Sequence, residues 1–524
     1  MAFKYGSSFT VLHLPDDLNE FRGLLGIMHN GEPAAKRLAH LLELRCKSVV
    51  VERDYIDFDY RAGFARFHFL RHQDTDRRCV RLHFFSHRLN RQHLLDIPQS
   101  IMKGYLGFSV IRPLPGFRLG RSLLSSWLVP DPPNDEGAFI TCGTRYQANL
   151  AGNELNFDGV PWMEQDTLVS ACASAALWVA STYMASKFSP EFKEYCTPHI
   201  TDMATRYVVT TGRAMPSVGL TIEQMMYAIQ EMGYEPVPYE PRSAFHALNI
   251  AYRYVESGIP VIVAVQFPRG GHALTAVGHT YDKKAKPAYQ YFEWTADITL
   301  TYMRSSGLVP SFIVQDDAGG PFRRLELVDW NEAIENGWIS KKDAKRLSPG
   351  FSCVVVLDRG TDSQEVGFLQ ALIGPIPPGV TLDGEGAELR ALCALATWYE
   401  SLKLKPPSSF LLRTYLQRSN QLKARFGSGA AITADRFRRE FRRHLMSKWV
   451  WVTEVADPDE FVSNNRCFGL IVQDSASHAS SPDFFDLIAL YLPGGLVTLM
   501  PKKGIHSFDI PGDVTLPAFT RVLG

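Results

Sequence analysis

The chain contains, in order, the residue types that form a catalytic triad with a cysteine nucleophile. Cys172 stands near the start of the run ACASAALWVAS (Ala171–Ser181), whose small and apolar residues predict a helix buried in a domain centre. Asp166, Thr167 and Ser170 precede it and are candidate N-cap residues. Because the N-terminus of a helix stabilises negative charge, this position favours the thiolate form of Cys172, which is the nucleophilic form.

A histidine and an acidic residue farther along the chain have the local settings that such a nucleophile requires. His272 follows Gly270 and Gly271 and precedes the apolar run LTAVG, so its ring is expected to point into a cleft and to act as general base. Asp316 follows the strand-like run FIVQ, where a carboxylate can orient the imidazole and stabilise the imidazolium. His279 is not favoured as the base, since it lacks the glycines and is expected to lie past the strand.

Two further residues belong to the candidate site. Asp317 is adjacent to Asp316, and neighbouring side chains at a strand end point in different directions, so one of the two is expected to orient the histidine. Gln165 lies seven residues before Cys172 and is a candidate donor to an oxyanion, together with backbone N–H groups at the helix start. Each residue alone has a common structural explanation, but the order Gln, Cys, His, Asp in these settings favours catalysis.

Three segments resemble the active-site blocks of papain-like cysteine peptidases: QDTLVSACASAALW, GHALTAVGHTYD and FIVQDDAGGPF. The first is similar to the peptidase domains that process bacteriocins in bacterial exporters, and the helix expected at Thr221–Met232 resembles one that these domains carry. The resemblance implies that Cys172 is the nucleophile, His272 the general base and then acid, and Asp316 the orienting residue. It also implies Gln165 as oxyanion donor, at one residue more than the usual spacing from the cysteine.

Changes in composition divide the chain into three expected domains. Residues 1–155 have the short alternating apolar and polar runs of a β-rich domain. Residues 156–360, which the resemblance covers, are expected to form a papain-like domain with a central helix on an antiparallel sheet. Residues 361–524 are expected to form a small α/β accessory domain, which makes the fold class α+β. Expected strands include Ser48–Glu52, Phe64–Phe69, Val80–Phe85, Gly107–Arg112, Pro260–Phe267 and Phe312–Gln315, and expected helices include Thr221–Met232, Glu388–Leu402 and Thr433–Lys448.

Composition points to a protein of the cytoplasm without a membrane or nucleic-acid partner. The 524 residues include 55 Lys and Arg and 55 Asp and Glu, so the formal net charge is zero. No run approaches the roughly 18 apolar residues of a membrane span, and the start of the chain lacks the apolar run of a signal peptide. The eight cysteines are scattered without a CxxC pair, which is typical neither of a zinc site nor of a disulfide framework. No metal and no cofactor is expected.

These features predict a cysteine peptidase that hydrolyses peptide or isopeptide bonds in proteins through a thioester intermediate. A protein or peptide substrate is the expected partner, and a regulatory protein is a further candidate because the flanking domains are expected to select the substrate or restrain the site. The same residues would serve a deamidase or an acyltransferase, since that distinction lies in the cleft and the acceptor. A non-catalytic binding protein with a degenerate site is another alternative. The last alternative is a metal site at His83, His87 and His93, although the spacing of these histidines is not diagnostic of metal binding.

Overall fold

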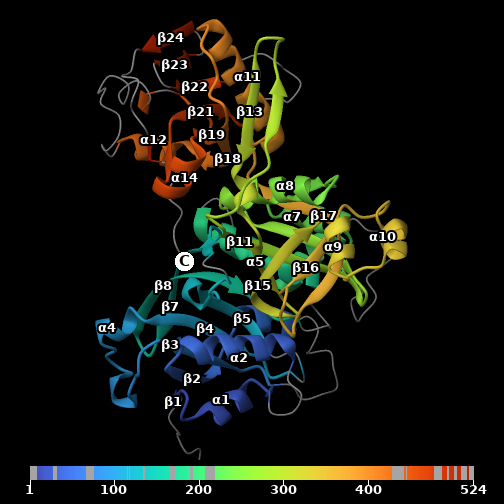
Figure 1. Ribbon diagram of the computed structural model, residues 1–524. Helices are drawn as coiled ribbons and strands as arrows, with labels where there is room; N and C mark the ends of the chain where they lie inside the picture. Colours follow the sequence, from blue (N-terminus) through green and yellow to red (C-terminus); the bar gives the residue numbers. More distant parts are fainter. Residues whose placement is uncertain are drawn as a thin grey trace, which may run out of the picture.

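The computed structural model is a mixed α+β protein whose strands gather into three large sheets (Figure 1). Among the residues that the structure describes, none of the helices is long and apolar enough to cross a membrane. The residues that the structure describes are 9–27, 32–65, 76–114, 116, 119–133, 136–165, 172–188, 193–206, 219–427, 442–443, 445–476, 487–492, 495–500, 504–508 and 516–517.

The first sheet comes from the N-terminal region and its pairings are all antiparallel, in the order β1-β2-β3-β4-β5-β8-β7. The strand expected at Phe64–Phe69 is wrong where it can be checked, because residues 64 and 65 continue the helical turn after α3 (Phe58–Gly63); the rest lies outside the described residues. The strands are β1 (Phe9–His13), β2 (Ser48–Tyr55), β3 (Cys79–Phe85), β4 (Tyr105–Ile111), β5 (Leu119–Ser125), β7 (Thr144–Leu150) and β8 (Asn153–Trp162).

The second sheet closes on itself. Its order is β10-β11-β14-β15-β16-β17, and β17 pairs back to β10, so six antiparallel strands form a ring to which β6 and β9 attach. A closed ring leaves its six strands without unpaired edges. The strands are β6 (Gly137–Ile140), β9 (Glu235–Tyr239), β10 (Val261–Phe267), β11 (Gly270–Tyr281), β14 (Phe312–Asp316), β15 (Gly320–Val328), β16 (Val354–Leu357) and β17 (Glu365–Ile376).

The third sheet lies in the C-terminal part of the molecule and contains one parallel pairing, β13 with β18. Two of its strands, β12 and β13, come from the middle of the chain. The strands are β12 (Gln290–Glu293), β13 (Thr299–Arg304), β18 (Phe410–Arg418), β19 (Trp449–Ala456), β21 (Gly469–Asp474), β22 (Leu487–Leu492), β23 (Gly495–Met500) and β24 (Gly504–Phe508), and a separate ribbon pairs β20 (Arg466–Cys467) with β25 (Leu516–Pro517).

The sheets do not follow the expected domain boundaries. The boundary at residue 155 falls inside β8, and β6 from the N-terminal part pairs with β11 of the second sheet. The boundary at residue 360 precedes β17, which closes the second sheet, while β12 and β13 leave that region to join the third sheet. Composition reports where loops lie but not which strands pair, so the three regions interleave more than the sequence indicates.

Helix α5 (Cys172–Phe188) lies between the first and second sheets, in contact with β7 and β8 on one side and with β10, β11 and β14 on the other. This position explains why the helix is apolar all round. One continuous core runs from the first sheet through α5 into the second and includes Trp162 and Trp178, both fully buried. A helix placed in this way has its ends fixed by both sheets, which positions whatever its first residue carries.

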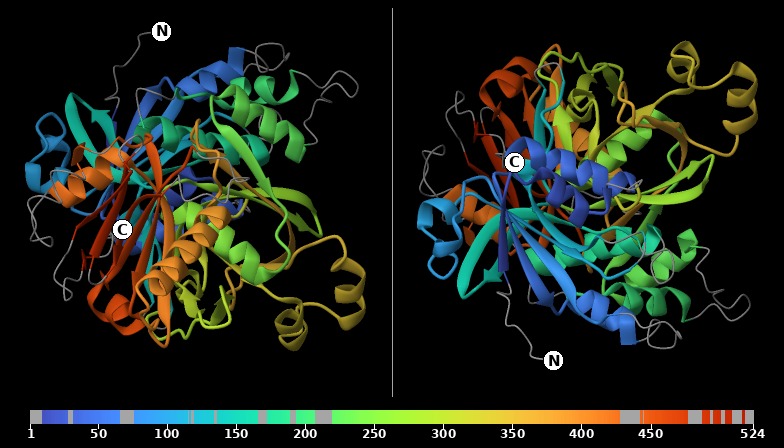
Figure 2. Two further views of the ribbon diagram at one scale, coloured as in Figure 1. Left: turned by 90° about the horizontal axis from the view of Figure 1, so that it is seen from above. Right: turned by 90° about the horizontal axis from the view of Figure 1, so that it is seen from below.

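Of the other helices, α2 (Pro33–Arg45) contacts β15 of the second sheet, and α8 (Ala244–Glu256) contacts β11 of the second sheet and β18 of the third. The helix expected at Thr221–Met232 is α7 (Ile222–Glu231), whose N-cap Thr221 forms a capping box with Gln224. The helix expected at Thr433–Lys448 falls mostly outside the described residues, and residues 445–448 are not helical. Two short helices, α9 and α10, project from the edge of the second sheet (Figure 2). The remaining bounds are α1 (Leu18–Leu24), α4 (Gln99–Met102), α6 (Thr197–Thr205), α9 (Trp330–Glu335), α10 (Lys341–Leu347), α11 (Gly384–Ser401), α12 (Ser419–Gly427) and α14 (Pro458–Asn464).

Candidate active site

Cys172 is the first residue of α5. Its side chain is half-buried, whereas Ala173 and Ser174 behind it are buried against the sheets. The first turn of an α-helix has backbone N–H groups without intrahelical acceptors, and these stabilise an anion at the helix start. The candidate N-cap residues at 166, 167 and 170 lie outside the described part of the chain. The structure therefore puts the sulfur at a helix N-terminus where solvent can still reach it.

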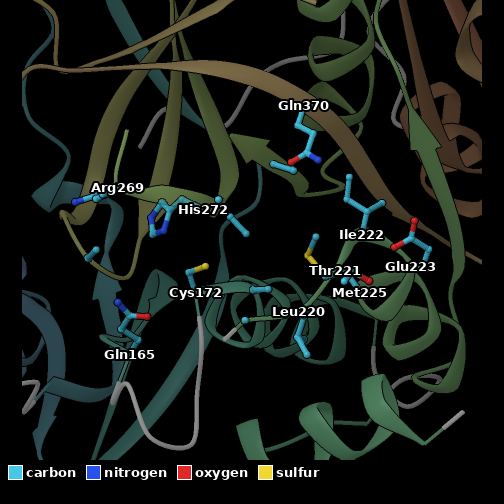
Figure 3. A pocket seen from close by; sticks show the side chains of 16 residues that line it. Gln165, Cys172, Leu220, Thr221, Ile222, Glu223, Met225, Arg269, His272 and Gln370 are labelled. Carbon is cyan, nitrogen blue, oxygen red and sulfur yellow. The ribbon is translucent and has the colours of Figure 1, made fainter. Parts of the chain in front are cut away.

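His272 lies near the start of β11, directly after the turn that connects β10 to β11. It pairs in register with Val265, and Gly270 before it has φ +129°, a backbone conformation that suits glycine. The ring projects into the same pocket as Cys172, which Figure 3 shows below it. The glycine turn that marked this histidine in the sequence thus brings the ring to the N-terminus of α5.

The two ring nitrogens of His272 have different partners. Nε2 lies 2.9 Å from Oδ1 of Asp316, the last residue of β14. Nδ1 is then left for the Cys172 side, where the sulfur and the ring line one pocket (Figure 3). The three residues come from three elements, α5, β11 and β14, that meet because α5 packs across the second sheet. The structure brings together the cysteine, histidine and aspartate that the sequence predicts as a triad.

Asp316 is fully buried and is held from several sides. Oδ1 also accepts from the backbone N of Ala318 (2.9 Å), and Oδ2 accepts from Nη1 of Arg323 (2.8 Å). Its main-chain carbonyl accepts from Nε1 of Trp162 (2.8 Å). Burial alone would raise the pKa of Asp316, but the charges of His272 and Arg323 and the hydrogen bond from His272 lower it well below its ordinary value. Asp316 is therefore a fixed anion behind the ring.

Effects of opposite sign act on the pKa of His272. Burial lowers it, because a charged imidazolium loses hydration. The Asp316 carboxylate, its hydrogen bond to the ring, the hydrogen bond with Cys172 and the nearby Asp317 raise it, and together they hold the pKa well above the ordinary value. The imidazolium is thus stable beside the sulfur, and a Cys172 thiolate would have a cationic partner.

Asp317 points toward the same ring but is placed differently. Its Oδ1 lies 3.5 Å from Nε2 of His272, longer than the contact that Asp316 makes. Burial and the negative charge of Asp316 raise the pKa of Asp317 to about 7. Geometry and charge therefore favour Asp316 over Asp317 as the residue that orients the histidine, which is the residue that the resemblance implies.

Gln165 follows β8 of the first sheet and lines the same pocket as Cys172 and His272. Arg112, at the end of β4, holds the backbone here: its Nη2 donates to the carbonyls of Glu164 (2.9 Å) and Gln165 (3.4 Å). Figure 3 shows the Gln165 side chain below Cys172, on the side away from α7. An amide there is positioned to donate to an oxygen near the sulfur, so the longer spacing in the sequence does not separate the two residues.

The pocket in front of Cys172 has a volume of about 580 Å³, within the usual range for binding sites of organic ligands. The start of α7 forms the wall opposite His272, with the apolar side chains of Leu220, Ile222 and Met225. Arg269 and Gln370 line it from the second sheet. The pocket therefore combines an apolar wall with polar groups, and a chain laid across it would pass over the sulfur.

Within the described residues, one group of side chains has donor atoms close enough to hold a metal ion: His272, Asp316 and Asp317, within 4.8 Å of one another. Oδ2 of Asp316 is already paired with the guanidinium of Arg323, and a fixed positive charge next to a ligand opposes binding of a dication. The histidines of the alternative metal site do not form such a group there, since His83 is buried and bonded to Tyr105 and Glu52. The donor set suits a proton-transfer pair better than a metal centre.

His279 has a structural role instead. It lies inside β11, not past the strand as the sequence suggested, and its Nε2 is 2.8 Å from Oε2 of Glu256 in α8. Both side chains are fully buried. The expected position was wrong because β11 continues past Gly278 to Tyr281 through the polar residues His279 and Thr280. The conclusion that His279 is not the catalytic base is unaffected.

The residues that hold Asp316 and Gln165 in place are absent from the sequence prediction. Arg323 and Arg112 contact the site through buried guanidinium groups, and Trp162 does so through its indole. Arg323 could have been found from the sequence, because the alternation of residues along β15 places this charged side chain on a buried face. Arg112 and Trp162 carry no local signal, since their partners lie far away in the chain.

A search against protein-family models and a search of curated proteins both find no match for this chain.

Proposed function

We propose that the protein is a cysteine peptidase that hydrolyses peptide or isopeptide bonds in protein substrates, with a papain-like arrangement of its central helix and sheet. The observation that carries the proposal is the arrangement of Cys172, His272 and Asp316. A half-buried thiol at a helix N-terminus faces an imidazole whose far nitrogen is bonded to a buried carboxylate. A purely structural cysteine gains nothing from such neighbours, whereas a nucleophile requires them.

The proposed reaction begins with the Cys172 thiolate and the His272 imidazolium. The sulfur attacks the carbonyl carbon of the scissile amide, and its electron pair forms the C–S bond while the carbonyl becomes an oxyanion. The Gln165 amide and backbone N–H groups at the start of α5 donate to that oxygen. His272 then gives its proton to the leaving nitrogen as the C–N bond breaks, which leaves a thioester.

Hydrolysis of the thioester reverses these roles. Neutral His272 removes a proton from a water molecule, the resulting hydroxide attacks the thioester carbon, and the C–S bond breaks to release the acid and the thiolate. Asp316 stays ionised throughout, stabilising the imidazolium and fixing which ring nitrogen faces the sulfur. A carboxylate that changed protonation during the cycle would lose this function.

The pocket and the cysteines support the remaining parts of the proposal. A protein or peptide segment fits a cleft that has an apolar wall along α7 and polar groups opposite. All eight cysteines are free thiols, which is usual in a reducing compartment, so we place the enzyme in the cytoplasm. The C-terminal sheet stands apart from the pocket, and a regulatory protein that binds there would be a second partner.

Selective alkylation tests the proposal. Iodoacetamide should modify Cys172 at neutral pH well before Cys393, the other half-buried cysteine, and the remaining cysteines should react last because they are buried. Burial raises the pKa of Cys142, for example, to about 12. A comparison of new protein N-termini in cells that express the wild type or Cys172→Ala then identifies substrates. Equal reactivity of Cys172 and Cys393, with no N-termini specific to the wild type, would contradict the proposed function.

A further inference from the structure

Two adjacent carboxyl groups lie beside one imidazole. Oδ1 of Asp316 is 2.9 Å and Oδ1 of Asp317 is 3.5 Å from Nε2 of His272. Both side chains are buried, so ionising both would put two negative charges next to one cation in a site of low dielectric. What surrounds each carboxyl must therefore decide which of the two carries the charge.

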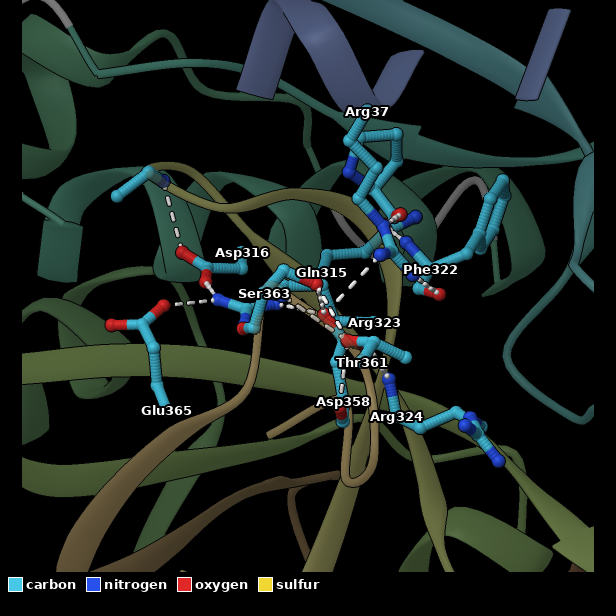
Figure 4. A network of polar contacts seen from close by, with 12 residues as sticks. Arg37, Gln315, Asp316, Phe322, Arg323, Arg324, Asp358, Thr361, Ser363 and Glu365 are labelled. Atoms are coloured by element: carbon cyan, nitrogen blue, oxygen red, sulfur yellow. Dashed lines mark hydrogen bonds and ion pairs between the residues drawn. The ribbon is translucent and has the colours of Figure 1, made fainter. Parts of the chain in front are cut away.

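Arg323 on β15 makes that difference. Its side chain is 2% exposed, and Nη1 lies 2.8 Å from Oδ2 of Asp316, whereas His272 contacts Oδ1 (Figure 4). The same guanidinium pairs with Oδ2 of Asp358 (2.7 Å) and Oε1 of Glu365 (2.7 Å). Asp317 has no arginine or lysine within ion-pair distance among the described residues. Arg269, which is half exposed and paired with Glu365, acts on Asp317 only from beyond that distance, so the buried positive charge lies next to Asp316.

Arg37 of α2 holds the start of β15, the strand that carries Arg323. Its Nε and Nη2 donate to the carbonyls of Pro321 (2.7 Å) and Phe322 (2.6 Å), the two residues before Arg323. Phe322 has φ +54°, an unfavourable conformation for a side chain of this size, so the backbone here needs external support. Nη1 of Arg37 also lies 3.2 Å from Oδ2 of Asp358. The N-terminal region therefore supports the arginine that contacts the triad.

Two glycines between Asp316 and Arg323 leave room for these contacts. A Cβ atom on Gly319 would lie 2.2 Å from Nη1 of Arg323 and 2.5 Å from Oδ2 of Asp316. A Cβ on Gly320 would lie within 2.9 Å of the aliphatic part of the Arg37 side chain. The Gly-Gly pair is thus required by the close approach of two arginines and not only by the turn.

We propose that Arg323, supported by Arg37, is a positioning residue that fixes the negative charge on Asp316 and keeps it off Asp317. This inference rests on the proposed function, because it assigns the charge opposite the catalytic histidine. Without the guanidinium, the two carboxyls would compete for the same imidazole. Charge on Asp317, at the longer distance and a different angle, would turn the ring away from the sulfur. Arg323 acts only through Asp316 and touches no substrate.

The rate of Cys172 alkylation by iodoacetamide at pH 7 tests this without knowledge of a substrate. Arg323→Gln should lower the rate about tenfold, as expected when the ring is less well oriented. In that background the negative charge moves partly to Asp317. Asp317→Asn leaves Asp316 as the one of the two carboxyls that can carry the charge, so it should restore most of the rate in the Arg323→Gln chain and change the rate little in the wild type. Arg323→Lys keeps the positive charge and should restore most of the rate.

A second variant perturbs the contact without removing a charge. Gly319→Ala places a methyl group between Arg323 and Asp316, so its alkylation rate at Cys172 should fall as that of Arg323→Gln does. This variant carries the test if Arg323→Gln fails to fold. Gly350→Ala is the matched control, because a Cβ there meets only the Leu347 carbonyl, at 3.8 Å. An effect of Asp317→Asn that is the same in the wild-type and Arg323→Gln backgrounds would overturn the inference. A wild-type Cys172 that reacts no faster than Cys393 would instead contradict the proposed function, and histidine NMR of the same variants would still show whether the His272 titration depends on Arg323.

Discussion

The indole Nε1 of Trp162 donates a hydrogen bond to the main-chain carbonyl of Asp316 over 2.8 Å. Trp162 is the last residue of β8 in the first sheet, and Asp316 is the last residue of β14 in the second. The residues that directly follow β8 include Gln165, which lines the pocket. The N-terminal sheet is therefore part of the candidate site, because it fixes the carboxylate behind the histidine and supplies an amide in front of the sulfur.

Removal of the imidazole should abolish most of the activity while the protein stays folded. His272→Ala is expected to lower the rate of substrate cleavage by about a factor of 10³ or more, since the thiolate loses its cation and the leaving group its proton donor. His87→Ala is the matched control, because His87 is exposed on the N-terminal region. Cleavage is measured on a substrate found by the N-terminus comparison. Similar rates for both variants would remove His272 from the mechanism.

The amide of Gln165 should act on the transition state and not on binding. Gln165→Ala is expected to lower kcat by about 10²–10³ with little change in KM, the usual cost of losing an oxyanion donor. Gln147→Ala, an exposed residue of β7, serves as control. Arg112→Met should reproduce part of the loss, because Arg112 holds the carbonyls of residues 164 and 165. A change confined to KM would show that Gln165 only binds substrate.

The candidate triad was predictable from sequence because each member carries a local signature. Cys172 opens a run of small residues, His272 follows two glycines, and Asp316 ends a strand, and each of these patterns is readable within about ten residues. The class of fold was predictable for the same reason, since helices and strands have local periods. These local signatures and periods belong to short segments, so they can be recognised before the pairing of distant segments is known.

Pairing between distant segments was not predictable. The closure of the second sheet through β10 and β17 joins residues about 100 apart, and nothing in either strand specifies the other. Arg37 and Phe322 are separated by 285 residues, so the support of the site by α2 has no local sequence signal. Strand pairings cross the expected boundaries at 155 and 360 for this reason, because those boundaries follow loops and composition while strands pair with distant partners.

Asp317 should make the stability of the protein depend on pH. Burial and Asp316 raise its pKa to about 7, above the value near 3.9 of an unfolded aspartate. Between these values the folded state holds more protons than the unfolded state, so the free energy of unfolding falls as pH rises from about 4 to 7 and is level above it. Asp317→Asn removes this contribution. The free energy of unfolding of Asp317→Asn, measured in urea and taken relative to that of the wild type at the same pH, should increase from about pH 4 to 7. A difference that does not change with pH would contradict the raised pKa of Asp317.

A buried chain of charges joins the second and third sheets and should determine stability without touching the chemistry. Glu256 of α8 bonds His279 through Oε2 and pairs with Arg413 of β18 through Oε1, and Nη1 of Arg413 lies 3.1 Å from Oε2 of Glu454. All four side chains are at most 1% exposed. Removing one partner leaves a buried charge uncompensated, which costs about 3–5 kcal/mol.

Arg413→Met is therefore expected to lower the free energy of unfolding by that amount, measured by chemical denaturation, while Cys172 keeps its alkylation rate in the folded protein. Arg346→Met is the matched control, since Arg346 pairs with Asp343 on the surface, where an ion pair contributes at most about 1 kcal/mol. Glu256→Gln should be as costly as Arg413→Met, because it leaves the same guanidinium with one carboxylate. If Arg413→Met were no more destabilising than Arg346→Met, the two sheets would be held together by their apolar contacts and not by this chain of charges.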